Sequence, residues 1–369
     1  MKFLALVTDA FGGTGGIARY DRDLITAIAR HPKTTQVDIV PRVIAREVEP
    51  LPDRVVHHEA AAQSAPRFIA ATLRLALGSS SADWILCGHV NLLPIAIMAA
   101  RISKAGIILA SYGLETWYPK SARTARQLRR VGALISISEH TLERMREWAN
   151  LDAIPTFVLP NAVDLASFSP GPPDPALARR LGVDNRKVVF TLGRMDASER
   201  AKGFDQIIEG LPSLASRIPE VVYIAGGEGS DRARLESRAK DLGVADRVIF
   251  PGYIPEADKV GYFRLADVFA MPSRLEGFGY VFLEALACGV PVVASETDGG
   301  REAIRNGAWG LLVNPDKVHE IACAIESALV NPRIPARSEL EYFSVDRFDR
   351  RCHAMLDALD RSPGMPQRS

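Results

Sequence analysis

The stretch that decides the fold is Arg274-Leu275-Glu276-Gly277-Phe278-Gly279, followed at a helical distance by Glu284. Before it, residues 267–271 form a short apolar run that ends at a Pro-Ser pair, which is typical of a buried strand. After it, residues 280–288 have helical spacing and stop at a glycine and a proline. We therefore predict Glu276 on a loop at the carboxyl end of a strand and Glu284 one turn inside the next helix.

This arrangement can hold a polar ligand. The Gly-rich start of a helix offers backbone N–H groups that bind anionic or hydroxylated ligands. Carboxylates on either side of the turn accept hydrogen bonds from sugar or ribose hydroxyls. Taken alone, two glutamates at this spacing usually indicate only a solvated helix residue and a glycine turn. The remainder of the chain favours the ligand site.

Short apolar segments alternate with amphipathic segments along the whole chain. Such alternation, with strands that are apolar throughout, predicts parallel sheets covered by helices on both faces, in two doubly wound domains. The predicted strands lie near 3–8, 36–40, 84–88, 106–110, 133–137, 155–159, 187–192, 221–225, 247–250, 267–271, 291–294 and 310–313, and the predicted helices include 16–30, 139–149, 204–216, 231–242 and 316–330.

Composition agrees with a two-domain protein. The chain has 369 residues, 47% of them hydrophobic and 24% charged, and a domain takes ~150 residues. No apolar run approaches the ~18 residues that span a bilayer. We expect the four cysteines, Cys87, Cys288, Cys323 and Cys352, to be buried free thiols of a reducing cytoplasm. The proline-rich stretch 169–175 is the predicted hinge, because proline fixes φ and removes a donor.

Five blocks of the chain, in this order, resemble the retaining glycosyltransferases of family 4, within glycosyltransferase group 1. They are Gly12-Gly13-Thr14-Gly15-Gly16, Asn161-Ala162-Val163-Asp164, Gly193-Arg194 with Lys202-Gly203, Gly226-Gly227-Glu228-Gly229, and Arg274 to Gly279 with Glu284. The resemblance implies an α/β GT-B fold, with two doubly wound Rossmann-like domains facing an interdomain cleft. Residues 1–168 would bind the acceptor and 176–344 the nucleotide sugar, while a helix at about 345–369 crosses back onto the first domain.

The resemblance also implies roles for single residues. Arg194, Lys202 and Glu276 would be catalytic, with the two cations holding the donor diphosphate as negative charge grows on it. The intervening Arg200 would be a helper or a bystander. The implied donor-binding residues are Gly16, Tyr253, Ile254, Gly277, Phe278, Gly279 and Glu284, and those of the acceptor or sugar cleft are Gly13, Gly15, His89, Tyr112 and Glu115.

Tyr112 departs from the family pattern, because family members commonly carry histidine at this position. A neutral tyrosine is not a general base near neutral pH. In the front-face mechanism proposed for retaining transferases, the departing phosphate takes the acceptor proton, and Tyr112 would then position the sugar. His89, at another strand end, is read as a hydrogen-bonded structural histidine that can lie nearby. Ser138 is predicted to cap the helix that follows it.

We predict no metal and no cofactor apart from the nucleotide-diphosphate sugar that serves as co-substrate. Asp21-Arg22-Asp23 has the Asp-x-Asp form of a metal site but lies inside a predicted helix, so we interpret it as a solvated helix turn. The basic run Lys120–Arg130 fits either a solvated helix face or a patch that meets anionic lipid headgroups. A near-neutral pI of 7.7 argues against nucleic acid as a partner.

The sequence therefore predicts a retaining, metal-independent glycosyltransferase that moves a sugar from a nucleotide-diphosphate sugar to a glycan or lipid-linked acceptor. By analogy with the family it would make surface polysaccharide or lipid-linked glycans, in the cytoplasm or peripherally at the inner face of the cell membrane. Two alternatives remain: a nucleotide-sugar epimerase of the same architecture, and a non-catalytic nucleotide-sugar-binding protein. The base, the sugar and the acceptor leave no side-chain signature in the sequence.

Overall fold

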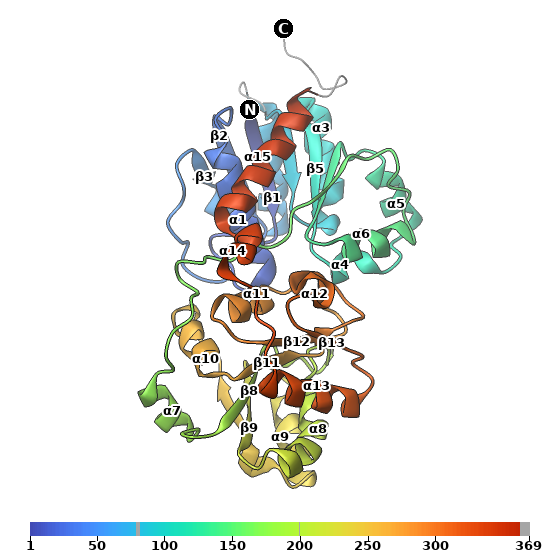
Figure 1. The fold of residues 1–369 in the computed structure, drawn as a ribbon. Helices are drawn as coiled ribbons and strands as arrows, with labels where there is room; N and C mark the ends of the chain where they lie inside the picture. Colours follow the sequence, from blue (N-terminus) through green and yellow to red (C-terminus); the bar gives the residue numbers. More distant parts are fainter. Residues whose placement is uncertain (79–81, 199, 362–369) are drawn as a thin grey trace. The chain divides into compact units, whose positions relative to one another are not determined.

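The computed structural model describes residues 1–78, 82–198 and 200–361. The chain divides into two compact units, one built from Met1–Ala162 and the segment from Val345 onward, the other from Val163–Ser344. Each unit is a parallel sheet with helices packed on it (Figure 1). The predicted α/β class with two Rossmann-like domains is therefore confirmed, and the interdomain cleft stays a prediction.

The first unit has a seven-stranded sheet in the order β3-β2-β1-β4-β5-β6-β7, parallel throughout. Its strands are β1 (Lys2–Val7), β2 (Gln36–Pro41), β3 (Val55–His57), β4 (Trp84–Cys87), β5 (Gly106–Ser111), β6 (Ala133–Ser136) and β7 (Thr156–Val158). All except β3 were predicted. The edge strand β3 spans three residues and none of them is buried, so no apolar run indicates it.

Helices cover both faces of this sheet. They are α1 (Gly15–Arg30), α2 (Ala65–Leu77), α3 (Leu93–Ser103), α4 (Leu114–Trp117), α5 (Ala122–Leu128), α6 (Glu139–Arg146) and α15 (Val345–Arg361). One core joins α2, α3, α5 and α6 to alternate strand residues such as Leu6 and Leu109. On α15, His353 Nε2 lies 2.9 Å from the carbonyl oxygen of Ala27, so this last helix packs beside α1 (Figure 1).

The second unit has a six-stranded parallel sheet in the order β10-β9-β8-β11-β12-β13. Its strands are β8 (Lys187–Leu192), β9 (Val221–Gly226), β10 (Val248–Gly252), β11 (Val268–Met271), β12 (Val292–Ser295) and β13 (Leu311–Val313), each within a few residues of its prediction. Its helices are α7 (Pro175–Leu181), α8 (Phe204–Arg217), α9 (Arg232–Asp241), α10 (Lys259–Leu265), α11 (Tyr280–Ala287), α12 (Gly300–Ala303), α13 (Val318–Val330) and α14 (Arg337–Leu340). Loops at the carboxyl ends of parallel strands gather at one edge, where ligands bind in this class of sheet.

The first boundary between the units lies at Ala162, ahead of the predicted 168. The reason is that the chain joins the second unit before it reaches the prolines. The Val163 N–H donates to the Phe343 carbonyl at 2.8 Å, and the Phe168 ring packs edge-on against Phe263 with centroids 6.1 Å apart. The proline-rich stretch is therefore part of the second unit.

Two further expectations concern the cysteines and the membrane. Cys87, Cys288 and Cys352 are buried free thiols as expected, but Cys323 is exposed, so that prediction was wrong. On α13 the buried side chains include Ile321, Ala322 and Ile325, and Cys323 lies between these positions on the outer side. Among the described residues, none of the helices has both the length and the apolar character needed to span a bilayer.

Candidate functional site

Lys202 and Glu276 meet in the second unit although they are 74 positions apart in the chain. Lys202 lies just before α8, and Glu276 lies on the loop between β11 and α11. The Lys202 ammonium donates to Glu276 Oε2 at 2.7 Å, and both side chains are less than a quarter exposed. Gly279 is the N-cap of α11 at φ 89°, a conformation that favours glycine. The structure thus brings two of the three predicted catalytic residues into direct contact.

Asp298, on the loop between β12 and α12, holds the loop that carries Glu276, and the sequence prediction missed it. Its Oδ2 accepts hydrogen bonds from the Ser273 hydroxyl at 2.6 Å and from the Glu276 N–H at 3.0 Å. Its Oδ1 accepts from the Gly300 N–H at 3.0 Å. Burial raises the pKa of Asp298 to about 7, and the negative charge of Glu276 adds to the shift. Only its place at a strand end, before two glycines, signals it in the sequence.

Glu284 lies one turn inside α11, as predicted, and its side chain is fully buried. The Lys259 ammonium lies 3.9 Å from Glu284 Oε2 and also 2.7 Å from Glu256 Oε2. Lys259 begins α10 and was not singled out from the sequence. A buried carboxylate costs free energy unless it is paired, so a fully buried glutamate at a helix start favours a specific role over the solvated alternative.

The glycine-rich loop after β9 lies directly against the loop after β8. A Cβ added to Gly227 would lie 1.9 Å from the Gly193 carbonyl oxygen. The Gly193 N–H donates to the Gly226 carbonyl at 3.1 Å, and the Met195 N–H to the Glu228 carbonyl at 2.9 Å. These glycines are required for close backbone approach, and they fix the course of the loop that carries Arg194.

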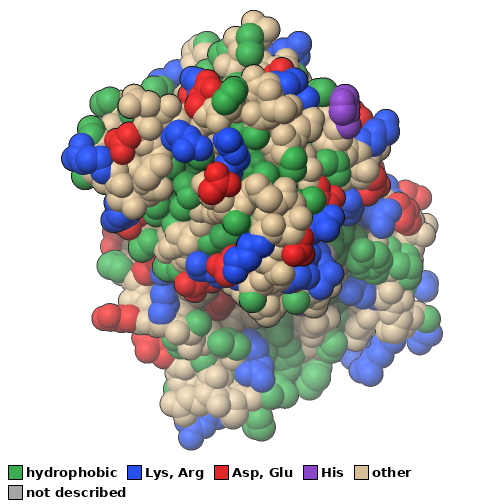
Figure 2. All heavy atoms as spheres, turned by 90° about the horizontal axis from the view of Figure 1, so that it is seen from below, with side chains coloured by type: hydrophobic (Ala, Val, Ile, Leu, Met, Phe, Trp, Pro, Cys, Tyr) green, Lys and Arg blue, Asp and Glu red, His purple; other side chains and the backbone are tan. Residues whose placement is uncertain are grey.

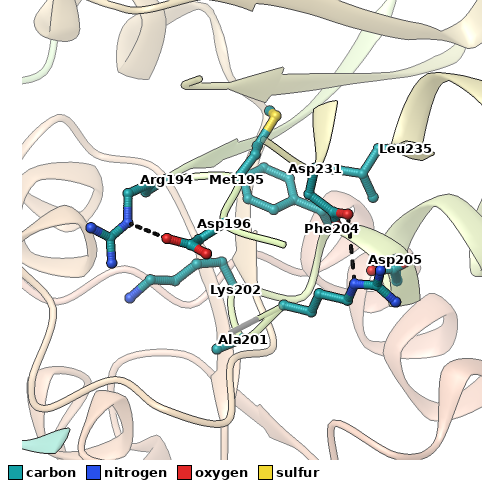
Figure 3. A pocket seen from close by; sticks show the side chains of 10 residues that line it. Arg194, Met195, Asp196, Ala201, Lys202, Phe204, Asp205, Asp231 and Leu235 are labelled. Carbon is teal, nitrogen blue, oxygen red and sulfur yellow. Dashed lines mark ion pairs between the residues drawn. The ribbon is translucent and has the colours of Figure 1, made fainter. Parts of the chain in front are cut away.

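A pocket lies in the second unit between the loop after β8 and the start of α8 (Figure 3). Arg194 and Lys202 both line it. The Arg194 guanidinium Nε lies 3.5 Å from Asp196 Oδ2, and the Arg194 side chain is 66% exposed. Arg200 lies instead 3.6 Å from Asp231 Oδ1. The Arg194 side chain is therefore largely exposed to solvent, whereas Arg200 belongs to a separate ion pair.

The other predicted donor residues divide by burial. Tyr253 is 63% exposed, whereas Ile254 is buried next to Gly226. The Phe278 side chain belongs to the core, with its ring centroid 5.6 Å from that of Phe343. Phe278, like Gly277, can therefore contact a ligand only through its backbone.

In the first unit, the Tyr112 hydroxyl donates to Asp21 Oδ1 in the interior. The Tyr112 ring packs edge-on against Tyr20, with centroids 5.5 Å apart. Asp21 is fully buried, and this burial raises its pKa well above the usual value. The interpretation of Asp21-Arg22-Asp23 as a solvated turn was therefore wrong for Asp21. Ala18, Leu24 and Ile25 on α1 are also buried, which places Asp21 on the inner side of the helix.

Glu115 and His89 lie at the neighbouring strand ends. Glu115 Oε1 accepts from the Tyr112 N–H at 2.6 Å and from the Gly113 N–H at 3.3 Å. His89 Nδ1 accepts from the Asn91 N–H at 3.0 Å, and burial lowers the pKa of His89. His89 is therefore a neutral, hydrogen-bonded histidine, as the sequence suggested.

The glycines at the start of α1 differ from one another. A Cβ on Gly13 would lie 2.3 Å from the Asp9 carboxyl carbon, so Gly13 is required by packing. Gly15 has φ 85°, and a Cβ on Gly15 or Gly16 would meet no described atom within 4 Å. These two positions leave the start of the helix open.

Elsewhere, the Ser138 hydroxyl accepts from the Thr141 N–H, which confirms Ser138 as the cap of α6.

No group of three or more His, Cys, Asp or Glu side chains that could hold a metal ion occurs in the described part of the chain. The carboxylates of the second-unit site are engaged by cations and backbone N–H groups instead, as shown by Lys202 on Glu276 and Gly300 on Asp298.

Comparison with known proteins gives consistent matches. A model of the family described as Glycosyl transferases group 1 matches residues 175–343. A GDP-mannose-dependent alpha-(1-6)-phosphatidylinositol monomannoside mannosyltransferase of Mycolicibacterium smegmatis is 32% identical over 295 residues, which are 76% of each chain. A D-inositol 3-phosphate glycosyltransferase of Rhodococcus jostii is 39% identical over 185 residues, 47% of this chain and 39% of that protein.

Among solved structures, Anabaena Alr3699/HepE in complex with UDP-glucose superposes with a TM-score of 0.75 at 22% identity. The match covers 97% of this chain and 100% of that one. The trehalose-6-phosphate synthase OtsA superposes with a TM-score of 0.70 at 15% identity, over 98% of this chain and 100% of that one. These structures share the two-domain fold.

Proposed function

Since the chain belongs to the group 1 glycosyl transferases, a family of GT-B enzymes that use nucleotide-sugar donors, we propose that it transfers the sugar with retention of anomeric configuration and without a metal ion. The acceptor is a glycan or a lipid-linked molecule. The observation that carries the proposal is the Lys202–Glu276 ion pair. Lys202 lines the same pocket as Arg194, and Glu276 lies on the loop before α11, the helix that holds the buried Glu284.

The second unit binds the donor in this proposal. Glu284 accepts hydrogen bonds from the ribose hydroxyls, and Glu276 with the backbone of Gly277-Phe278-Gly279 holds the sugar. As the glycosyl bond breaks, negative charge grows on the departing phosphate. Arg194 and Lys202 offset that charge, which lowers the barrier more than it tightens ground-state binding. Glu276 keeps the Lys202 ammonium aimed at the site until the diphosphate arrives.

The first unit binds the acceptor in this proposal. The departing phosphate takes the acceptor proton, so no side-chain base is required. Tyr112 then has a positioning role. Its hydroxyl donates a hydrogen bond to Asp21 in the interior, and its backbone N–H donates to the Glu115 carboxylate and holds that side chain in place. The neutral His89 lies at the end of the neighbouring strand.

Relatives guide the choice of substrates to test. Several are named as GDP-mannose-dependent mannosyltransferases that act on phosphatidylinositol monomannosides. We therefore propose GDP-mannose as the first donor to test and a glycosylated phospholipid as the first acceptor, in place of the surface polysaccharide predicted from the sequence. The reaction would take place in the cytoplasm, at the inner face of the cell membrane.

Incubation of the purified protein with GDP-, UDP- and ADP-sugars, with and without a phosphatidylinositol mannoside, tests the proposal. We expect release of nucleoside diphosphate, together with a glycoside that keeps the anomeric configuration of the donor. An epimerised donor would instead indicate the epimerase. Binding without turnover would indicate a non-catalytic nucleotide-sugar-binding protein, and an inverted product would contradict retention.

A further inference from the structure

Arg234, in the first turn of α9, is bound by two carboxylates at once. Its Nε and Nη2 donate to the two oxygens of Asp231, three positions earlier in the chain. Its Nη1 and Nη2 donate to the two oxygens of Asp205 on α8, at 2.6 Å and 2.7 Å. A planar guanidinium matches the geometry of a carboxylate, and bidentate pairs of this kind are strong and directional. Every nitrogen of the Arg234 head group is therefore held in a defined position.

Both of these carboxylates belong to the pocket that Arg194 and Lys202 line. Asp205 and Asp231 are among its lining residues (Figure 3). The Asp231 side chain is only 5% exposed. Asp205 lies three positions after Lys202, in the first turn of α8. One side of the Arg234 contact therefore fixes the start of the helix that follows Lys202.

The start of α9 holds the segment that follows Arg194. The Asp231 N–H donates to the Met195 carbonyl at 3.0 Å. The Ala197 N–H donates to the Ser230 hydroxyl at 3.2 Å. The other side of the Arg234 contact therefore reaches the loop after β8 through the residues just before α9.

An ion pair between α8 and α9 is not unusual by itself. Figure 2 shows the molecule from below the view of Figure 1, and this face carries both Lys or Arg and Asp or Glu side chains. A second pair joins the same two helices one turn further on, where Arg238 Nη2 donates to Glu209 Oε1 at 2.9 Å. Each member of this pair lies four positions after its counterpart in the first pair, and neither is among the described residues that line the pocket. The two pairs therefore join the same helices but differ in their contact with the pocket.

The carboxylates beside the pocket require a cation. Hydrogen bonds from Arg234 hold the pKa of Asp231 below its usual range, so Asp231 is ionised at neutral pH. Arg200 also approaches Asp231, at 3.6 Å, but its side chain is 53% exposed. Without Arg234, negative charge on Asp205 and Asp231 would repel a diphosphate in the pocket and attract the cations that should meet it.

We propose that Arg234 is a positioning residue of the transfer reaction. It ties the loop after β8 to the starts of α8 and α9, so that Arg194 and Lys202 face the donor diphosphate. This inference rests on the proposed function, because the diphosphate is the group that these two cations are proposed to meet. Arg234 is not among the described residues that line the pocket, so it acts through its neighbours.

Steady-state kinetics of Arg234→Gln, with whichever of the GDP-, UDP- and ADP-sugars the wild type turns over fastest, tests the proposal. A misplaced active-site group costs up to ~10²-fold in rate, so kcat should fall ~10-fold to 10²-fold and by a larger factor than donor KM rises. Arg238→Gln is the matched control, since the two arginine side chains are 33% and 42% exposed, and it should leave kcat close to wild type. Arg194→Ala with Arg234→Gln should lose little more than Arg194→Ala alone, because residues that act through one another are not additive.

Amide hydrogen exchange followed by NMR tests the positioning without a substrate. The Met195 and Asp231 N–H groups, which form hydrogen bonds in and beside the loop, should exchange faster in Arg234→Gln than in Arg238→Gln. Asp205→Asn, which removes one carboxylate and keeps an accepting oxygen, should change kcat and exchange in the same direction by less. It also serves as the test variant if thermal unfolding shows that Arg234→Gln does not fold.

The outcomes separate this inference from the proposed function. A wild type that transfers no sugar would refute the proposed function, and amide exchange would still decide the role of Arg234 in holding the loop. The inference is overturned if Arg234→Gln and Arg238→Gln have the same kcat, or if both variants exchange alike. It is also overturned if the losses caused by Arg194→Ala and Arg234→Gln multiply in the double variant, because Arg234 would then not act through Arg194.

Discussion

Asp298→Asn should remove a pH dependence from the stability of the second unit. The Asp298 carboxyl group accepts three hydrogen bonds in a fully buried position, and burial raises its pKa to about 7. In the unfolded chain the pKa is about 4. Between these values the folded protein keeps a proton that the unfolded chain has lost. Stability therefore falls as the pH rises from about 4 to 7, and the full loss is present above that window.

The size of the effect follows from the shift. Three pH units at 1.36 kcal/mol each give ~4 kcal/mol in total, of which ~2–3 kcal/mol falls between pH 5 and 8. Asparagine does not titrate, but its amide N–H₂ replaces one of the two accepting oxygens. In one orientation the N–H₂ faces the Gly300 N–H, and in the other it faces the Ser273 hydroxyl and the Glu276 N–H. That mismatch should cost ~1–3 kcal/mol at every pH. The stability gap between wild type and Asp298→Asn should therefore shrink by ~2–3 kcal/mol from pH 5 to pH 8.

Tryptophan positions allow this unit to be followed by itself. Of the four tryptophans, Trp309 is the one in the second unit, and Trp84, Trp117 and Trp148 lie in the first. Urea unfolding of 5-fluorotryptophan protein, followed by ¹⁹F NMR at pH 5, 6, 7 and 8, reports each unit separately. The first-unit resonances serve as the internal control and should not change with the variant. A gap that stays constant with pH would refute the reasoning, because Asp298 would then be ionised in the folded state as it is in the unfolded chain.

Three further predictions concern the site. Arg194→Ala should lower kcat by on the order of 10²-fold, while Arg200→Ala, whose side chain pairs with Asp231, should leave steady-state kcat close to wild type; equal losses would contradict the assigned roles. Tyr112→Phe should destabilise the first unit by ~1–3 kcal/mol, because the buried Asp21 loses its donor, with a smaller effect on kcat; an inactive but equally stable variant would mean that Tyr112 takes part in the chemistry. EDTA should leave the transfer rate unchanged, and loss of activity that Mg²⁺ or Mn²⁺ restores would disprove metal independence.

Much of the fold could be predicted from the sequence because the strands are buried on both faces. Segments such as 221–226 are apolar throughout, since helices cover the sheet on each side. The edge strand Val55–His57 has no such pattern, because it is short and partly exposed. The position of Glu284 could be predicted because it depends on the local sequence alone. The glycine turn marks the start of the helix, and the helical period then places Glu284 one turn inside it.

Two errors could have been avoided. Asp21 lies three positions after Ala18 and three before Leu24, within the apolar stripe of α1, so helical phase already indicates burial. The same argument places Cys323 outside the stripe of Ile321 and Ile325. In both cases the local motif alone does not show which side of the helix the residue lies on, and the helical period does.

Other features depend on contacts that the sequence does not encode locally. The Lys202–Glu276 pair and the Asp298–Glu276 hydrogen bond join residues 74 and 22 positions apart. They arise because parallel strand order brings the loops after β8, β11 and β12 to one sheet edge. Motif order predicted which loops matter, and only the structure shows which side chains touch.

The central claim is that the second unit binds a nucleotide-diphosphate sugar through Glu284. Isothermal titration calorimetry of the wild type and Glu284→Gln with GDP-mannose, UDP-glucose and ADP-glucose tests it most directly. The substitution keeps the shape of a fully buried side chain but removes its charge, and thermal unfolding verifies that the variant is folded. We predict that at least one nucleotide sugar binds the wild type and that Glu284→Gln binds it ~10-fold to 150-fold more weakly, as expected for hydrogen bonds to a charged group worth ~1.5–3 kcal/mol. Binding of equal strength to both proteins, or no binding of any nucleotide sugar to the wild type, would contradict the claim.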